Sequence, residues 1–118
     1  MVRGADGLEV LISGTSEGPN ANHIARARLA LSHIEDAASL SIRLLQSFVH
    51  ESGSWSFDEL NVGQDADQNR CEFQTALSFS PSNGSDSYGY TSFVVCFRSF
   101  QDSKRTRIHP YKTVIEFL

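Results

Sequence analysis

Apolar residues follow two different periodicities along this chain, and the main change falls near residue 52. Residues 20–50 repeat apolar side chains every three or four positions, which is the spacing of a helix with one buried face. Five other runs are typical of strands, with alternating apolar and polar positions or with apolar residues on both faces. These runs are residues 8–13, 55–62, 71–79, 88–100 and 111–118. The order β-α-β-β-β-β predicts an α+β fold, in which one long helix packs on a mainly antiparallel sheet of about five strands.

The helical segment carries one apolar stripe that predicts which of its residues are buried. Its members follow each other in steps of three or four: Ile24, Ala27, Leu31, Ile34, Ala38, Ile42, Leu45 and Val49. We expect the stripe to pack on one face of the sheet. The residues expected to be mostly inaccessible are Ile24, Leu31, Ile34, Ile42, Leu45 and Val49, together with the strand residues Phe73, Leu77, Val95 and Phe97. A single helix of roughly thirty residues would be about 45 Å long, which is more than the usual three to four turns. Two consecutive helices with a break within residues 36–39 are therefore the alternative.

Two local signals define the strands more closely. In residues 55–62 the apolar positions change parity, so a β-bulge near Asp58 and Glu59 would keep all of them on one face. Asn83-Gly84 is a typical two-residue hairpin turn. Such a turn pairs residues whose numbers sum to 167, so that Cys71 faces Cys96 at a distance that a disulfide can span. A reducing compartment instead favours two buried free thiols, and we predict that form.

Composition is that of one ordinary globular domain, residues 1–118. The chain has 40% apolar residues and no apolar run of eighteen residues, so we expect no membrane association. The first residues lack the apolar core of a signal peptide, and the chain has two cysteines. These features favour the cytoplasm.

Charge is distributed unevenly around a net value of −4. Residues 51–100 hold seven acidic residues against two arginines, a net charge of −5, while residues 101–118 are basic, with four bases against two acids. An acidic middle disfavours a nucleic-acid partner, because phosphate binding needs a coherent basic surface. It suits a basic protein partner. The basic segment at residues 104–112 is interpreted as a solvated face.

One motif resembles a catalytic site. Residues 14–18 read G-x-S-x-G, and Ser16 would be followed by Asp65 or Asp67 and then by His109, in the order of a hydrolase triad. The chain is too short for the parallel sheet that carries such a motif, and Pro19 separates the serine from the helix. Glycine, serine and threonine are also common in any strand-to-helix loop. We therefore predict a protein that is not an enzyme, with a small hydrolase using Ser16 as the alternative.

No cofactor or metal site is predicted. Residues 65–69 begin like a calcium loop, but Arg70 and Ala76 stand where that loop needs glycine and glutamate. The four histidines and two cysteines show no metal-ligand spacing.

The candidate recognition residues lie around the only tryptophan. Tryptophan is enriched at interaction hot spots, although a lone tryptophan more often anchors the core. The predicted partner-binding residues are Trp55, Asp58, Glu59, Asp65 and Asp67. In its size, acidity and lack of catalytic residues the chain resembles the bacterial immunity proteins, a resemblance of class that transfers no residue. It implies a binding module that neutralises a basic cognate toxin, acting as a monomer or homodimer, while a purely structural homodimer is a further alternative.

Overall fold

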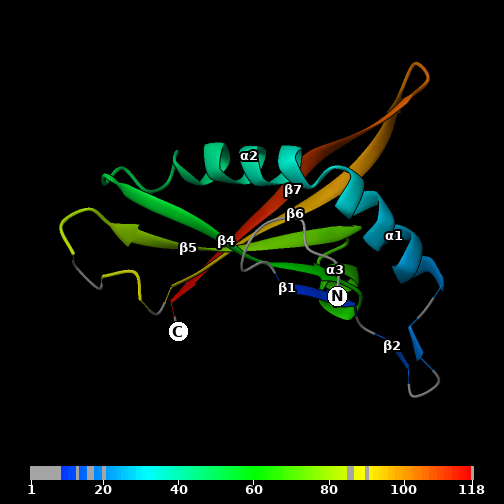
Figure 1. Ribbon diagram of the computed structural model, residues 1–118, viewed down its shortest axis with the longest axis horizontal. Helices are drawn as coiled ribbons and strands as arrows, with labels where there is room; N and C mark the ends of the chain where they lie inside the picture. The colour runs from blue at the N-terminus through cyan, green and yellow to red at the C-terminus, as the bar shows by residue number, and fades with distance from the viewer. Residues whose placement is uncertain are drawn as a thin grey trace.

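The computed structural model describes residues 9–12, 14–15, 18–19, 21–84, 87–89 and 91–117. The chain begins with β1 (Glu9–Ile12) and the two-residue strands β2 (Gly14–Thr15) and β3 (Gly18–Pro19). Two helices follow, α1 (Ala21–Ser32) and α2 (Ile34–Leu45). The remainder comprises β4 (Gly53–Val62), α3 (Gln64–Gln68), β5 (Phe73–Pro81), β6 (Thr91–Asp102) and β7 (Arg105–Phe117), as Figure 1 shows. The predicted α+β class is confirmed, with two helices in place of one.

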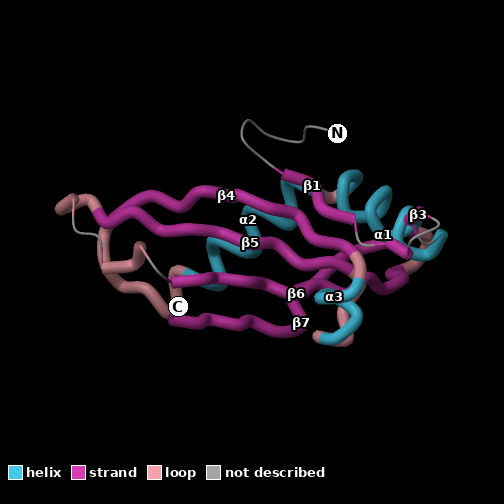
Figure 2. Tube along the Cα trace, turned by 90° about the horizontal axis from the view of Figure 1, so that it is seen from below, coloured by secondary structure: helices cyan, strands magenta, loops and turns pink. Residues whose placement is uncertain are grey.

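Five strands form the main sheet in the order β1-β4-β5-β6-β7. Strands β4 to β7 are antiparallel neighbours, and β1 pairs in parallel with β4 at one edge. Helices α1 and α2 cover one face of this sheet, called the inner face, and α3 lies against the other, outer face (Figure 2). Strand β7 forms the second edge. Strands β2 and β3 pair separately with each other.

The helical segment divides at His33 and not within residues 36–39. His33 has φ −118° and ψ 22°, outside the helical region, and no side chain caps α2 there. Its N–H still bonds to the Ala30 carbonyl, and its own carbonyl accepts from Ala37, so α2 begins again at once. The break allows α1 to change direction at the end of the sheet (Figure 1).

The buried face of the helices is centred on small residues, and only part of the predicted stripe lies on it. Ala27, Leu45 and Val49 are buried as expected, and the other buried positions of the segment are Ala30, Ala37 and Ser41. The larger residues Leu31, Ile34 and Ile42 pack half-buried around them. Ile24 is 36% exposed, so its prediction is wrong. The inner face is crowded with phenylalanine rings, and a helix can approach such a surface closely only through short side chains.

The strand half of the predicted core is confirmed. Phe73, Leu77, Val95 and Phe97 are buried. The Phe73 and Phe97 rings stack with centroids 5.1 Å apart. The bulge predicted in β4 is also present, since the register shifts between Phe57 and Glu59. As expected, Leu60 and Val62 are fully buried, and Trp55 and Phe57 pack half-buried against the same core.

The predicted hairpin register is wrong. Phe73 faces Phe97, and Gln74 faces Cys96, so paired numbers sum to 170 and not to 167. The connection runs from Pro81 to Thr91, because Tyr88 folds back onto Phe79 with ring centroids 5.2 Å apart. Contacts of this aromatic residue outweigh the local preference of Asn83-Gly84 for a tight turn.

Cys71 and Cys96 are nevertheless neighbours, as predicted, although they do not face each other in the strand pairing. Arg70 adopts a left-handed conformation with φ 60°, and the Cys71 N–H bonds to the Ala66 carbonyl. This turn takes Cys71 out of the strand and onto the outer face, where it forms a buried cluster with Cys96 and Ala66 of α3. The segment predicted as a polar turn thus contains a short helix. Both cysteines are free thiols. The hydrogen bond to Cys96, together with burial, raises the pKa of Cys71.

The helix–sheet core gives the first prediction. Leu45→Ala should lower the free energy of unfolding by about 2–5 kcal/mol, because it leaves a cavity at a fully buried position. Phe48→Ala is the control, since that side chain is 58% exposed. Urea unfolding of both variants measures the difference. Equal midpoints for the two variants would show that the helices pack by another face.

The cysteine cluster gives the second prediction. Because both thiols are buried and the pKa of Cys71 is raised, an aromatic disulfide reagent should label neither rapidly in the native protein. Both should react at once in denaturant. Rapid native labelling of either residue would place it at the surface and contradict the position of α3.

Candidate binding groove

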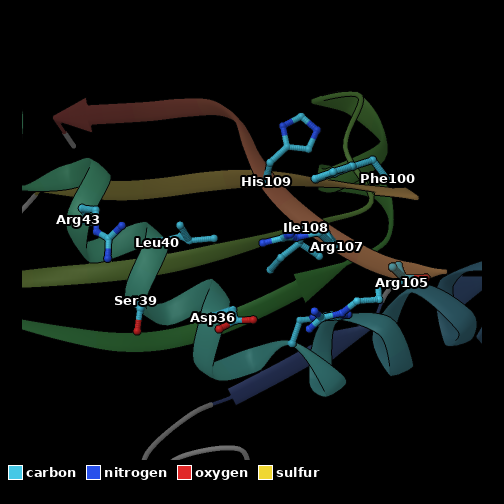
Figure 3. Close-up of a pocket in the computed structure, with 11 residues that line it drawn as sticks. Asp36, Ser39, Leu40, Arg43, Phe100, Arg105, Arg107, Ile108 and His109 are labelled. Carbon is cyan, nitrogen blue, oxygen red and sulfur yellow. The ribbon is translucent and has the colours of Figure 1, made fainter. Parts of the chain in front are cut away.

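A groove of about 400 Å³ lies between α2 and the end of the β6–β7 hairpin (Figure 3). Helix α2 and its start contribute His33, Asp36, Ser39, Leu40 and Arg43. The hairpin contributes Phe100, Arg105, Thr106, Arg107, Ile108 and His109.

The groove exists because β6 and β7 are longer than the strand beside them. Strand β5 pairs with β6 only as far as Phe97, whereas β6 and β7 continue as a two-stranded ribbon to the turn at residues 103–104. The ribbon therefore extends past the sheet and runs alongside the first turns of α2. Its tight turn needs Ser103 in a left-handed conformation, with φ 56°.

The groove carries an excess of positive charge. Its lining holds three arginines and two histidines against one carboxylate, Asp36. Arg107 is paired with Asp102 at 3.1 Å, an exposed ion pair. Among the described residues, no carboxylate lies within ion-pair distance of Arg43 or Arg105, and both arginines are exposed. These two guanidinium groups can therefore receive an anionic group from outside.

Apolar surface adjoins these cations. Ile108 is buried at 9% exposure and Leu40 is half-buried, so they form the floor. Phe100 is 42% exposed and meets the His109 ring edge to face, with centroids 5.2 Å apart. In Figure 3 the His109 ring points away from α2, which places this pair at the rim. The combination suits a ligand that has both acidic and apolar groups.

The groove offers donors and apolar contacts, not a nucleophile beside a base. Among the groove residues that the structure describes, no hydrogen bond joins Ser39 to a histidine. Over all the described residues, no group of three or more His, Cys, Asp or Glu residues could hold a metal ion. The arrangement can bind an anion through planar guanidinium groups, which match carboxylates well.

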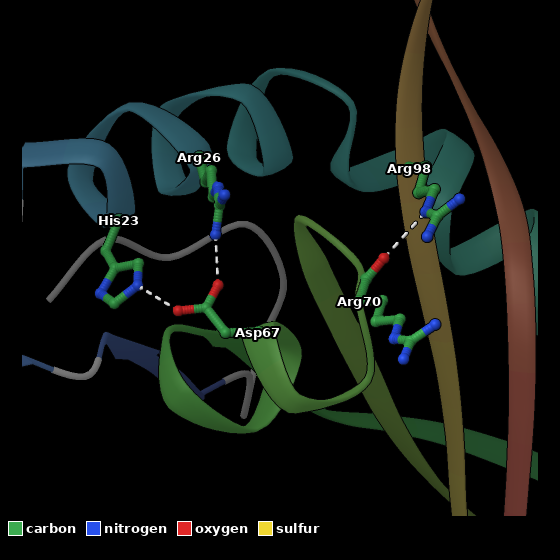
Figure 4. A network of polar contacts seen from close by, with 5 residues as sticks. All are labelled: His23, Arg26, Asp67, Arg70 and Arg98. Atoms are coloured by element: carbon green, nitrogen blue, oxygen red, sulfur yellow. Dashed lines mark hydrogen bonds and ion pairs between the residues drawn. The ribbon is translucent and has the colours of Figure 1, made fainter.

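A second polar cluster joins α1 to α3 (Figure 4). Asp67 accepts hydrogen bonds from His23, at 2.8 Å, and from Arg26. The His23 bond, with a further contribution from Arg26, holds the pKa of Asp67 below its ordinary value of 3.8. Nearby, Arg98 donates to the Arg70 carbonyl at 2.8 Å and lies over the Tyr111 ring at 3.5 Å. The network ties α3 to α1 and to the sheet.

The residues predicted for recognition come from two elements, β4 and α3. Trp55 is half-buried and packs on Phe79 and Phe93, with ring centroids 4.8 and 5.0 Å away. Asp58 is exposed and accepts a hydrogen bond from Ser56 at 2.6 Å.

The other predicted acids have different surroundings. Glu59 is half-buried opposite Ala76, and Asp65 belongs to α3. Asp67 already faces two basic side chains of its own chain. Of the five residues, Asp58 is the one whose described carboxylate is exposed and has no basic partner.

The proposed catalytic serine, Ser16, lies outside the described residues. His109, the third member of that hypothetical triad, belongs to the rim of the groove. None of the helices in the described part of the chain is long and apolar enough to cross a membrane.

Comparison with known proteins gives no relative. No protein-family model matches the chain, and no curated protein or solved structure is significantly similar to it. The geometry of the groove therefore provides the basis for a functional proposal.

The α1–α3 network gives the third prediction. The folded state lowers the pKa of Asp67, so its ion pairs stabilise the protein above pH 3.8 and lose this effect as the pH falls below it. Asp67→Asn should therefore reduce stability at neutral pH by no more than about 1 kcal/mol, since the pair is largely exposed. Urea unfolding as a function of pH measures this.

The control is Asp58→Asn, which removes an exposed carboxylate that has no basic partner among the described residues. The difference between Asp67→Asn and wild type should shrink toward acidic pH, whereas the control should stay close to wild type throughout. If Asp67→Asn lowered the free energy of unfolding equally at every pH, the effect would be due to packing and not to charge.

Proposed function

We propose that this protein is a non-catalytic binding module that holds an acidic segment of a partner protein in the groove between α2 and β7. The observation that supports this most directly is the pair of exposed arginines, Arg43 and Arg105, which have no carboxylate partner in the described structure. They lie on opposite walls of one groove, so a single acidic segment can contact both.

Charge contrast supports an acidic ligand. The whole chain carries −4, and the segment 51–100 carries −5, so the cations of the groove belong to a chain whose net charge is negative. The groove reverses this sign locally, and such a contrast directs an anionic segment to one place.

The apolar lining supports a protein segment over a nucleic acid. A phosphate backbone needs a long basic surface with repeated contacts, whereas this groove combines few cations with Leu40, Ile108 and Phe100. Acidic residues interspersed with apolar ones would satisfy both kinds of lining. The aromatic rim offers the kind of anchor found at protein interfaces.

The immunity-type hypothesis also describes a binding module, but it requires a partner of opposite charge. It assigns recognition of a basic toxin to Asp58, Glu59, Asp65 and Asp67. The ion pairs of Asp67 with His23 and Arg26 weigh against that surface, because a partner would have to displace them. The groove proposal requires an acidic partner that binds the arginines, whereas the immunity-type hypothesis requires a basic partner that binds the acidic residues.

The fourth prediction tests the groove by charge reversal. Tagged wild type, Arg43→Glu/Arg105→Glu, and the control Arg28→Glu, an exposed α1 residue, would be used to capture partners from a lysate of the native host. A partner bound by wild type and the control but lost from the double variant is then produced recombinantly. Its affinity for the double variant should be reduced at least about tenfold, and the wild-type affinity should fall as salt rises.

A second variant distinguishes the alternative. Asp58→Lys/Glu59→Lys should bind the partner as wild type does, since these residues lie outside the groove. A partner lost from this variant and retained by the arginine double variant would contradict the groove and support the acidic surface. Binding of nucleic acid in place of a protein would contradict both.

A further inference from the structure

Strand β7 leaves a long edge of the sheet open. It is the last strand in the order β1-β4-β5-β6-β7, and no described segment pairs with its outer side. Figure 2 shows it running along the border of the molecule. An open edge exposes backbone N–H and C=O groups that can pair with another strand.

The C-terminal half of this edge is regular and carries three large apolar residues. A bulge at Tyr111, opposite the step from Cys96 to Phe97, separates it from the half that lines the groove. Beyond the bulge, residues 112–117 pair without interruption with β6. Val114 and Ile115 are half-buried, while Phe117 is 81% exposed, the most exposed large apolar residue described.

The charges of β7 fit a second copy of the same strand in one register. When two identical strands pair in antiparallel about a two-fold axis, the numbers of each two facing residues add up to an even total. The reason is that only residues of equal parity direct their backbone groups to the same edge of the strand. Glu116 is the single acid of β7, and its bases are Arg105, Arg107 and Lys112. Of these bases, only Lys112 lies beyond the bulge, in the same uninterrupted segment as Glu116, and its Nζ donates to Asn69 of its own chain at 3.1 Å. Within residues 112–117 a sum of 228 is therefore the one register that places Glu116 opposite a base.

The same register satisfies the other positions. Val114 then faces Val114 of the second copy, and Thr113 faces Ile115, which are favourable pairs of β-branched residues. Pro110, which has no N–H to donate, lies outside the paired segment. The Lys112–Glu116 pair occurs twice, once on each side of the axis.

We infer that two copies of this chain associate through residues 112–116 of β7, antiparallel about an axis at Val114, so that their sheets become continuous. The groove lies on the other half of β7, so this association is independent of the proposed function.

The fifth prediction tests this register. Sedimentation velocity over a range of concentrations should show a monomer–dimer equilibrium for wild type. Lys112→Glu and Glu116→Lys should each raise the dimer dissociation constant by about tenfold, because each change places like charges opposite each other twice. The double exchange Lys112→Glu/Glu116→Lys should restore the wild-type constant. Lys104→Glu, in the exposed hairpin turn, is the matched control and should have no effect.

Zero-length cross-linking gives an independent test on unaltered protein. Along one strand, Lys112 and Glu116 are about 13 Å apart, whereas in the dimer they are direct neighbours. A carbodiimide applied to a mixture of ¹⁴N- and ¹⁵N-labelled chains should yield Lys112–Glu116 links that join one light and one heavy peptide. A monomer at all concentrations, or a dimer whose mixed cross-links lack this pair, would overturn the inference.

Discussion

A buried hydrogen bond between Ser41 Oγ and Thr75 Oγ1, 2.8 Å long, fixes α2 above the centre of the sheet. Thr75 in turn donates to the Val95 carbonyl at 3.4 Å, so the contact connects the helix to β5 and β6. Both side chains are fully buried, and an unpaired hydroxyl there would cost about 1–3 kcal/mol. The bond therefore selects one placement of the helix, and this placement determines how far α2 stands from the β6–β7 ribbon. The groove depends on that distance and on the length of the β6–β7 ribbon.

Patterns of local periodicity predicted much of the fold. Alternation located the strands, and the parity change in β4 located the bulge between Phe57 and Glu59. Patterns failed where long-range packing decided the outcome. The helix buries Ala37 and Ser41 at its centre because the phenylalanine rings leave room only for short side chains, which hydrophobicity alone does not indicate. Likewise, Tyr88 packing on Phe79 lengthens the connection that Asn83-Gly84 would have closed in two residues.

The candidate site was less predictable than the fold. The basic character of residues 104–112 is visible in the sequence, but nothing local indicates that Arg43 of α2 lies across a groove from Arg105. That both residues line one groove depends on the helix placement and on β6 and β7 extending past β5. Conversely, the acidic residues looked available in the sequence because the ion pairs of Asp67 join segments more than forty residues apart. A charge count cannot distinguish a carboxylate that is paired with basic side chains of its own chain from one that is unpaired.

Recognition is proposed to take place in the groove between α2 and β7. Backbone amide chemical shifts of the ¹⁵N-labelled protein, followed while the acidic segment of its captured partner is added, test this most directly. The largest changes should fall in residues 36–43 and 105–109, on both walls of the groove. Changes confined to Trp55, Asp58 and Glu59 in β4, with none in those two segments, would contradict it.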